Sequence, residues 1–293
     1  MTLFHALEAT PWLLVSVVLL LGLLVGSFLN VVILRVPEML FRDWRTQARE
    51  ILELPADPRD STEYNLVRPA SHCPGCGHAI RPRENIPVIS WLLLRGRCSS
   101  CGTRIGVRYP VVELATGLLS AIVAWQFGWG VELLPALVLT WSLIALAGID
   151  IDHQLLPDGI TLPVLWLGLL LSLMPVFVAP ADALLGAAAG YLSLWLVYQG
   201  FKLVTGKEGM GYGDFKLLAL LGAWLGWSAL PMIILLSALV GAVTGIAMIL
   251  LLGRDRQLPI PFGPYLAGAG WLALLWRDDI MAAYLQWSGL AGY

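Results

Sequence analysis

Long apolar runs constrain this chain more than any other feature. After about residue 110 the sequence is almost continuously hydrophobic, interrupted only by Gly, Pro and small groups of charges. Of all residues, 58% are apolar and 13% charged, against roughly 45 to 50% and about 25% in an average soluble domain. This composition, with a mean hydropathy of +0.77, predicts a membrane protein and excludes a soluble enzyme. The net charge of −2 also excludes nucleic-acid binding through bulk positive charge.

Apolar stretches near the ~20 residues needed to cross a bilayer predict eight transmembrane helices. The sixth stretch is short and contains Gly222 and Gly226, so we expect it to tilt, to thin the bilayer or to form a hairpin with the seventh. The expected fold is therefore an all-α polytopic membrane protein. The eight predicted spans are residues 12–34, 110–128, 132–150, 160–178, 183–204, 215–229, 231–252 and 261–277.

A hydrophilic insert follows the first predicted span. Twelve of the 18 Lys and Arg residues and all four Cys lie between Arg35 and Arg108. Positive loops face the cytoplasm, and with eight spans 17 of the 18 basic residues fall on that side, both termini lying outside. Within the insert, Glu38 to Leu54 is predicted to form an amphipathic helix. The expected domains are a first transmembrane helix (1–35), a cytoplasmic insert (36–109) and a seven-helix membrane domain (110–293).

The four cysteines form two C-x-x-C pairs, Cys73 with Cys76 and Cys98 with Cys101, separated by 21 residues. Four thiolates at this spacing predict a closed tetrahedral zinc site. Such a site leaves no position for a reactive water, so the zinc is expected to be structural. The alternative is two disulfides, which rarely persist in the reducing cytosol. The flanking His72 and His78 are expected to stay outside the ligand set.

Ionisable residues beside membrane spans are costly and are candidate functional groups. Asp150 ends the third predicted span and Asp214 begins the sixth on the same side, so their carboxylates are expected to face each other. Such a pair can act as acid and base, because two like charges in contact do not both ionise. The helix ends favour a charged Asp214 and a protonated Asp150. Gly211 and Gly213 allow an extended peptide to approach closely.

These motifs resemble the bacterial type IV prepilin leader peptidases, membrane enzymes that also N-methylate their product. The resemblance spans almost the whole chain after the first helix, and the combination of four cysteines with G-x-G-D is highly specific. The segments that carry it are HCPGCGHAIRPRENIPVISWLLLRGRCSSCG from His72, RYPVVELATG from Arg108, IDIDHQLLPD from Ile149, EGMGYGDFKLLALLGAWLG from Glu208 and PFGPYLAGAG from Pro261.

The resemblance implies aspartic proteolysis at the cytoplasmic face of the bacterial inner membrane, without a covalent intermediate. It makes Asp150 and Asp214 the catalytic pair, with Asp152 and Asp158 in supporting roles. The implied protein substrates are prepilins and pseudopilins, cut after a glycine at the membrane boundary, and the exposed amine is then methylated from S-adenosylmethionine. No glycine motif of a soluble methyltransferase accompanies that second activity, so the insert is its candidate region and Gly96 its candidate position.

Two other classes of protein compete with this interpretation. An ion-coupled transporter would use Asp150 and Asp214 as a cation relay, but it would more naturally show paired interrupted spans and ionisable groups near the bilayer midplane. An assembly scaffold would bind pilins without cutting them, and both aspartates would be dispensable. Glu113 and Glu132, near the ends of predicted spans, are expected to reach headgroups or water.

Overall fold

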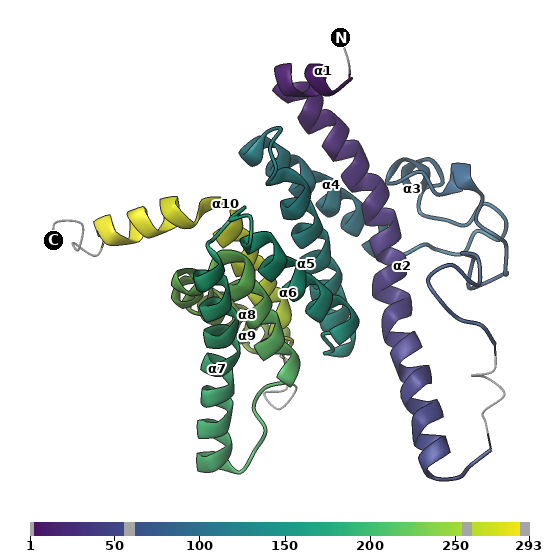
Figure 1. Cartoon of the computed structure of the whole chain (residues 1–293). Helices are drawn as coiled ribbons and strands as arrows, with labels where there is room; N and C mark the ends of the chain where they lie inside the picture. Colours follow the sequence, from purple (N-terminus) through teal and green to yellow (C-terminus); the bar gives the residue numbers. More distant parts are fainter. Residues whose placement is uncertain (1–2, 56–61, 254–259, 288–293) are drawn as a thin grey trace. The chain divides into compact units, whose positions relative to one another are not determined.

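The computed structural model of the chain describes residues 3–55, 62–253 and 260–287. Regular structure in these segments is helical, and β-structure is limited to two isolated bridges, His72 with Ala79 and Arg97 with Arg104. The chain forms two compact units, Met1–Leu133 and Leu134–Tyr293. Figure 1 shows their helices in chain order.

The first unit contains two long helices and a loop-rich insert between them, and the second contains six α-helices joined by short connections. The helices of the first unit are α1 (Leu3–Ala9), α2 (Pro11–Ile51), the 3₁₀ turn η1 (Pro82–Glu84), α3 (Ile89–Leu93) and α4 (Arg108–Phe127). Those of the second are α5 (Leu133–His153), α6 (Asp158–Ser172), α7 (Pro180–Thr205), α8 (Tyr212–Leu225), the 3₁₀ turn η2 (Trp227–Ala229), α9 (Leu230–Leu252) and α10 (Gly263–Trp287).

Each of the eight predicted spans coincides with one helix, from α2 and α4 through α10. By length and composition, five helical segments of the described chain can cross a membrane: α2, α4, α5, α7 and the segment Trp227–Leu251, which includes α9. The backbone of α10 departs from helical geometry at Trp276 (φ −136°, ψ 26°), beside the end predicted for the eighth span. The all-helical membrane fold is confirmed, while the count of eight spans stays a prediction.

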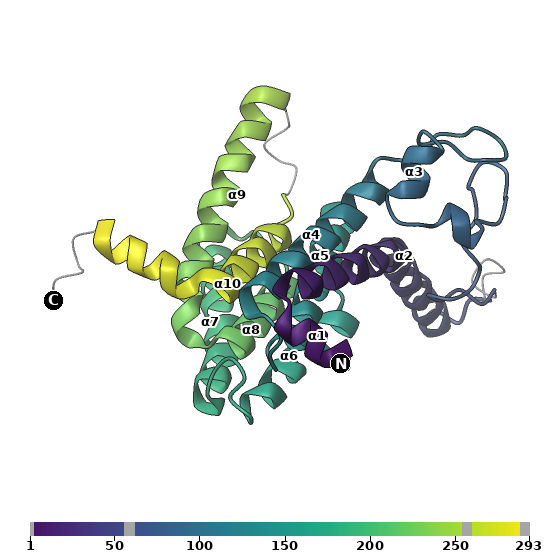
Figure 2. The same ribbon diagram turned by 90° about the horizontal axis from the view of Figure 1, so that it is seen from above.

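Helices α2 and α4 run alongside each other in the first unit (Figure 2). Their close approach depends on Gly22 and Gly26, a small-xxx-small pair on α2. A β-carbon at Gly22 would lie 2.6 Å from the Ser120 hydroxyl oxygen, and one at Gly26 would lie 2.7 Å from the Cα atom of Glu113. Side chains larger than hydrogen at these two positions would therefore push α4 away.

Helix α2 continues well beyond its apolar part. At 41 residues it is about 60 Å long, twice the ~30 Å of a bilayer core, so its C-terminal turns lie in water. Charged pairs support these turns, such as Arg42 Nε to Glu38 Oε1 at 2.9 Å. The amphipathic helix expected over Glu38 to Leu54 is thus the end of α2 rather than a separate element. The division of the chain into domains at residues 35 and 109 stays a prediction.

Helix α8 lies at the centre of the second unit, in contact with α6, α7, α9 and α10. Eleven of its 14 residues are buried, as expected for a helix that is apolar on all sides. Gly186 and Gly190 of α7 bring that helix into backbone contact with α8, at the carbonyls of Gly222 and Leu218. Since neighbouring helices surround it, α8 can be shorter than a bilayer-spanning helix.

Candidate functional site

The two C-x-x-C segments of the insert have the same local structure. In each, the N–H of the first cysteine donates to a carbonyl five residues later, and a glycine after the second cysteine donates back to the first. That glycine has a positive φ in both segments, which favours a residue without a β-carbon. The bonds are Cys73 to His78 (2.9 Å), Gly77 to Cys73 (2.9 Å), Cys98 to Thr103 (2.8 Å) and Gly102 to Cys98 (3.0 Å), and the two φ values are 70° and 71°.

This repeated turn brings the four thiols together. Their sulfur atoms lie within 4.8 Å of one another, and the Sγ atoms of Cys73 and Cys101 are 3.7 Å apart. A tetrahedral Zn–S distance of about 2.3 Å places its sulfurs about 3.8 Å apart, so the donor set fits a zinc ion. All four cysteines are unpaired by disulfides.

The Thr103 hydroxyl lies 3.1 Å from Cys101 Sγ. That hydroxyl, together with the Thr103 backbone, lowers the pKa of the Cys101 thiol to about 6. This lowered pKa favours the thiolate of Cys101, the form that ligates metals.

Glu84 connects the two cysteine segments. Its carboxylate accepts hydrogen bonds from the Arg81 N–H (3.0 Å) and from the hydroxyl of Ser99 (2.7 Å), a residue within the second C-x-x-C segment. It also lies 3.3 Å from Nε2 of His78, beside the first segment. The Arg81 amide and the Ser99 hydroxyl lower the pKa of Glu84 to about 2. His78 and His72 therefore use ring nitrogens for other partners, Glu84 and a backbone carbonyl at 3.0 Å.

Asp150 and Asp214 both lie in the second unit. Asp150 ends the buried face of α5 and Asp214 occupies the first turn of α8, and their exposed fractions are 5% and 8%. A β-carbon at Gly263, whose N–H donates to Asp150, would lie 3.2 Å from the Leu156 side chain, and one at Gly213, next to Asp214, would lie 2.8 Å from it. The two aspartates therefore lie around the same leucine. The structure therefore brings together the two residues that the sequence paired.

Gly263 is a residue of this site that the sequence analysis missed. Because Gly263 begins α10, its N–H has no acceptor within that helix. It donates instead to Asp150 Oδ2, at a distance of 2.9 Å. A β-carbon at this position would lie 2.7 Å from the same oxygen. The Gly-Pro pair that opens the last apolar segment was the available signal, because proline favours the first turn of a helix. A helix N-terminus that donates to Asp150 stabilises a negative charge there, an influence that was absent from the expectation based on α5 and α8 alone.

Asp158 and Asp152 lie in different environments. Both carboxylate oxygens of Asp158 accept hydrogen bonds from Lys216 Nζ at 2.7 Å, which ties the start of α6 to the first turns of α8. Asp152 is exposed, because two residues correspond to about 200° of rotation around a helix and it points away from Asp150. Of the two carboxylates expected to support the Asp150–Asp214 pair, Asp158 is therefore held against α8, whereas Asp152 is turned toward the surface.

The glycines before Asp214 lie where close contacts occur. The Gly211 carbonyl accepts the Asp214 N–H at 3.3 Å. A β-carbon on Gly213 would lie 2.8 Å from the Leu156 β-carbon, so the loop between α5 and α6 packs directly against this turn. The absence of a side chain at Gly213 therefore lets the loop with Leu156 approach the start of α8.

Gly96 and Glu113 both lie in the first unit. Gly96 has a φ of 65°, and a β-carbon there would lie 2.9 Å from the Trp91 ring. Glu113 was expected to reach headgroups or water, but it is only 8% exposed and accepts the Val88 N–H at 2.8 Å. The insert therefore folds over the start of α4 and buries that carboxylate.

Comparisons with known proteins agree with this arrangement. A model of the bacterial peptidase A24 N-terminal domain matches residues 20–127, and one of the type IV leader peptidase family matches residues 137–246. The prepilin leader peptidase/N-methyltransferase of Stutzerimonas stutzeri is 59% identical over 99% of this chain and 100% of its own length. The chain belongs to the type IV leader peptidase family. Proteins of the same name are 58% identical in Pseudomonas aeruginosa over 99% of both chains, and 52% identical in Neisseria gonorrhoeae over 91% of this chain and 92% of that protein.

The two family regions divide the candidate residues between them. The N-terminal region contains the four cysteines, Gly96 and Glu113, and the leader peptidase region contains Asp150 and Asp214. Gly263 lies beyond both regions, in a segment that the full-length relatives still cover. No solved structure matches the chain.

Proposed function

We infer that the chain is a membrane aspartic endopeptidase that removes the leader of type IV prepilins and pseudopilins and then N-methylates the new N-terminal residue. The observation that carries the peptidase assignment is the buried pair of Asp150 and Asp214, in a chain that is similar over its full length to prepilin leader peptidase/N-methyltransferases. The transporter and scaffold alternatives lose their support, because residues 137–246 match the type IV leader peptidase family.

In the proposed reaction, Asp150 is ionised and Asp214 is protonated. The Asp150 carboxylate removes a proton from a water molecule, whose oxygen attacks the scissile carbonyl carbon while Asp214 protonates the carbonyl oxygen. Collapse of this intermediate breaks the C–N bond. The proton held by Asp150 goes to the leaving nitrogen, and a hydroxyl proton of the intermediate returns to Asp214, which restores both carboxyl groups to their starting forms. The Gly263 N–H supports this division of roles, because it donates to Asp150. Burial supports it too, since two neighbouring carboxylates in a dry site do not both carry a charge.

We propose that the site faces the cytoplasm from the inner membrane. The basic residues of the insert and of the loops after α7 and α9 support this orientation through the positive-inside rule. A prepilin would then present its charged leader from the cytoplasm and its apolar helix from the bilayer, with the scissile bond at the boundary between them. That boundary is where the ends of α5 and α8 are predicted to lie.

We propose that Cys73, Cys76, Cys98 and Cys101 hold a structural zinc ion. The sulfur separations support this ligand set, and the matching hydrogen bonds of the two turns shape it before the metal binds. The ion would cross-link an insert (36–109) whose own apolar core is too small to hold it together. The methyl donor is proposed to be S-adenosylmethionine, with Gly96 in the region that serves methylation.

The test is cleavage of a purified model prepilin by the full chain in detergent, with product masses measured in the presence and absence of S-adenosylmethionine. Asp150→Asn and Asp214→Asn are each expected to abolish cleavage, whereas the control Asp278→Asn, at an exposed aspartate of α10 outside the candidate site, retains it. The wild-type product is expected to gain the mass of one methyl substitution only when S-adenosylmethionine is present. Cleavage that survives either substitution of the pair would rule out the proposed catalytic residues.

A further inference from the structure

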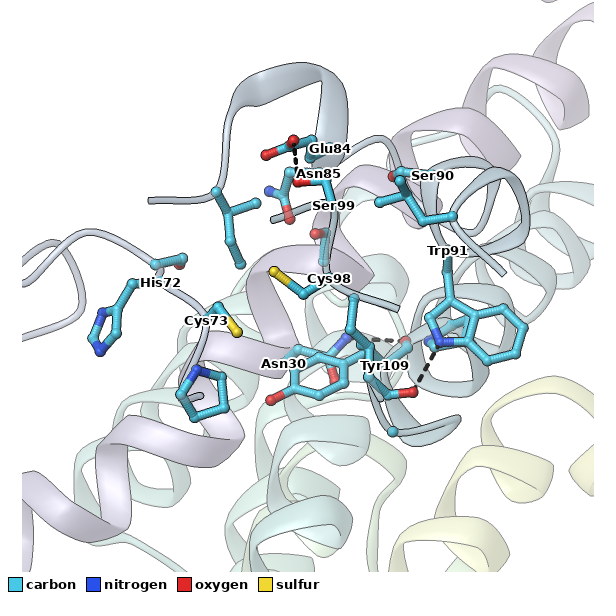
Figure 3. Close-up of a pocket in the computed structure, with 18 of the residues that line it drawn as sticks. Asn30, His72, Cys73, Glu84, Asn85, Ser90, Trp91, Cys98, Ser99 and Tyr109 are labelled. Atoms are coloured by element: carbon cyan, nitrogen blue, oxygen red, sulfur yellow. Dashed lines mark hydrogen bonds between the residues drawn. The ribbon is translucent and has the colours of Figure 1, made fainter. Parts of the chain in front are cut away.

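The first unit contains a pocket that the peptidase chemistry does not use. Its volume is about 450 Å³, within the range of about 300 to 1,000 Å³ typical of small-molecule sites. Its walls come from residues 27–35 of α2, from residues 109–113 at the start of α4, and from the insert (Figure 3). Cys73 and Cys98 contribute to the insert wall, so the pocket is continuous with the cysteine cluster.

Glu113 is the acidic group at the α4 side of this pocket. Its carboxylate accepts the Val88 N–H at 2.8 Å and a hydrogen bond from the Ser27 side chain. Both donors are neutral, and the side chain is 8% exposed. A cation beside a buried carboxylate lowers the cost of its charge, and Arg35, the basic residue of α2 in the lining, instead donates to the carbonyls of Asn65 and Pro69. A positively charged ligand group in the pocket would supply that partner.

The backbone at Val88 holds this carboxylate in place. Val88 has φ 61° and ψ −48°, a conformation that a β-branched residue rarely adopts. Such strain persists where the surrounding structure fixes it, and it is concentrated at ligand and active sites. Here the strained residue directs its N–H at Glu113, so the carboxylate is oriented before any ligand arrives.

Aromatic and amide side chains line the pocket beside Glu113. The Trp91 indole N–H donates to the Ile105 carbonyl at 3.2 Å, and the Asn30 amide donates to the Tyr109 carbonyl at 3.1 Å. Figure 3 shows both hydrogen bonds, with the Trp91 and Tyr109 rings among the pocket residues. Aromatic faces bind planar heterocycles by stacking and cations through the ring quadrupole.

We propose that this pocket binds S-adenosylmethionine, with Glu113 facing its cationic methionyl end and Trp91 and Tyr109 packing against its adenosine. The proposal rests on the methyltransferase half of the proposed function and assigns a site to it. The ligand combines a planar base with a sulfonium, an ammonium and a carboxylate group. These correspond to the aromatic walls, to Glu113 and to Arg35, which also lines the pocket together with Glu84. The amino terminus of a cleaved pilin offers a cation without a heterocycle, and it would leave the aromatic wall unused.

Two other features of the unit fit this assignment. A side chain at Gly96 would press on Trp91, so substitution there would deform the pocket wall. The presence of Cys73 and Cys98 in the lining means that loss of zinc would also disturb the pocket. Donor binding is therefore expected to depend on the integrity of the zinc site.

Equilibrium dialysis of the purified full chain against radiolabelled S-adenosylmethionine tests the proposal without relying on activity. The wild type is expected to bind one equivalent, and Glu113→Gln and Trp91→Leu are each expected to raise the Kd about tenfold or more. The matched control is Glu132→Gln, a glutamate of the same unit that does not line the pocket, and its Kd should equal that of the wild type. Zinc content measured on every variant shows whether the insert has folded.

Ultraviolet cross-linking of the labelled donor identifies the site directly. Label on peptides from residues 27–35 or 86–113 supports the proposal, whereas label confined to residues 134–293 overturns it. An unchanged Kd in a zinc-loaded Glu113→Gln variant also overturns it. So does a result in which a peptide with a free N-terminal phenylalanine binds in a Glu113-dependent manner and S-adenosylmethionine does not.

Prepilin cleavage by the same wild-type preparation separates this proposal from the peptidase assignment. Donor binding at the pocket without cleavage would count against the catalytic pair alone. Cleavage without donor binding would count against the pocket alone.

Discussion

Gly263 is the residue whose position most directly limits the chemistry of the aspartate pair. Its N–H donates to Asp150, and its missing side chain leaves the space that the carboxylate occupies. A hydrogen bond from a helix N-terminus to a carboxylate is charge-assisted and is roughly twice as strong as a neutral one. Gly263 therefore both orients Asp150 and favours its charged form, although it takes no proton itself.

We predict that Gly263→Ala lowers the kcat of prepilin cleavage by about 100-fold, because displacing a catalytic group by about 1 Å has an effect of that size. The control is Gly268→Ala on the same helix, where a β-carbon meets nothing within 4 Å. Steady-state cleavage of the model prepilin by the two variants, with far-ultraviolet circular dichroism to show retained helicity, makes the comparison. Equal rates would mean that the hydrogen bond is dispensable.

Glu84 has a comparable position in the insert, where it joins the two cysteine segments. We predict that Glu84→Gln accelerates zinc release to a chelator about tenfold, by analogy with residues that orient metal ligands. Glu63→Gln is the matched control, because Glu63 is an exposed acid of the same insert that pairs with Arg68. Zinc release followed with a colorimetric chelator gives the rates, and identical rates for the two variants would contradict the linking role.

The pH dependence of this effect follows from the lowered pKa of Glu84. Folding lowers that pKa from 4.5 to about 2, so its stabilising contribution is complete above 4.5 and is lost only as the pH falls toward 2. The difference between wild type and Glu84→Gln should therefore be constant from about pH 5 to pH 8. A difference that disappears within that window would require another titrating group.

At the scale of helices, small residues determine which elements approach each other. Gly22 and Gly26 set the distance of α2 from α4, and Gly186 and Gly190 set that of α7 from α8. In a bilayer, lipid tails are as apolar as leucine, so helices associate mainly through close packing and hydrogen bonds. The same close packing surrounds α8 with protein and positions Asp214 at its buried first turn.

We predict that Gly186→Ala destabilises the second unit by about 1 to 3 kcal/mol, the usual effect of adding a methyl group to a fully packed contact. Gly200→Ala on the same helix is the control, because a β-carbon there meets nothing within 4 Å. Thermal unfolding in detergent should show a lower Tm for the first variant and an unchanged or higher Tm for the second. The opposite order would mean that α7 and α8 are held together elsewhere.

Helices and local motifs could be predicted from the sequence, whereas long-range contacts could not. Apolar runs located α2 and α4 to α10, and the C-x-x-C spacing located the cysteine cluster, because both signals are local. The Asp150 contact with Gly263 joins residues 113 positions apart, and no local pattern records it. The sequence placed Glu113 at the membrane interface, because its burial by the insert depends on tertiary folding. The continuation of α2 through its charged part was also missed, because it is supported by salt bridges between side chains on successive turns.

At the scale of the whole molecule, the two units carry different groups of candidate residues. The aspartate pair lies in Leu134–Tyr293, and the cysteine cluster and pocket lie in Met1–Leu133.

We predict that zinc removal unfolds the insert locally, because metal binding and folding are one equilibrium in so small a module. Hydrogen exchange should rise in residues 62–107 after chelation and remain unchanged in α8. Protection of the insert that survives complete zinc loss would contradict this prediction.

The number of spans determines the side on which each end of the chain lies. Five helical segments of the described chain meet the length and composition criteria for crossing, while α6 and α8 are short and α10 bends at Trp276. If all eight predicted helices cross, an alkaline phosphatase fused after Tyr293 lies outside the cytoplasm and is active. A fusion after Gly206, in the basic loop that follows α7, should be inactive. If α8 only enters the membrane and returns, the C-terminal fusion would be inactive as well, and the positive-inside assignment of the loop after α9 would have to be reversed.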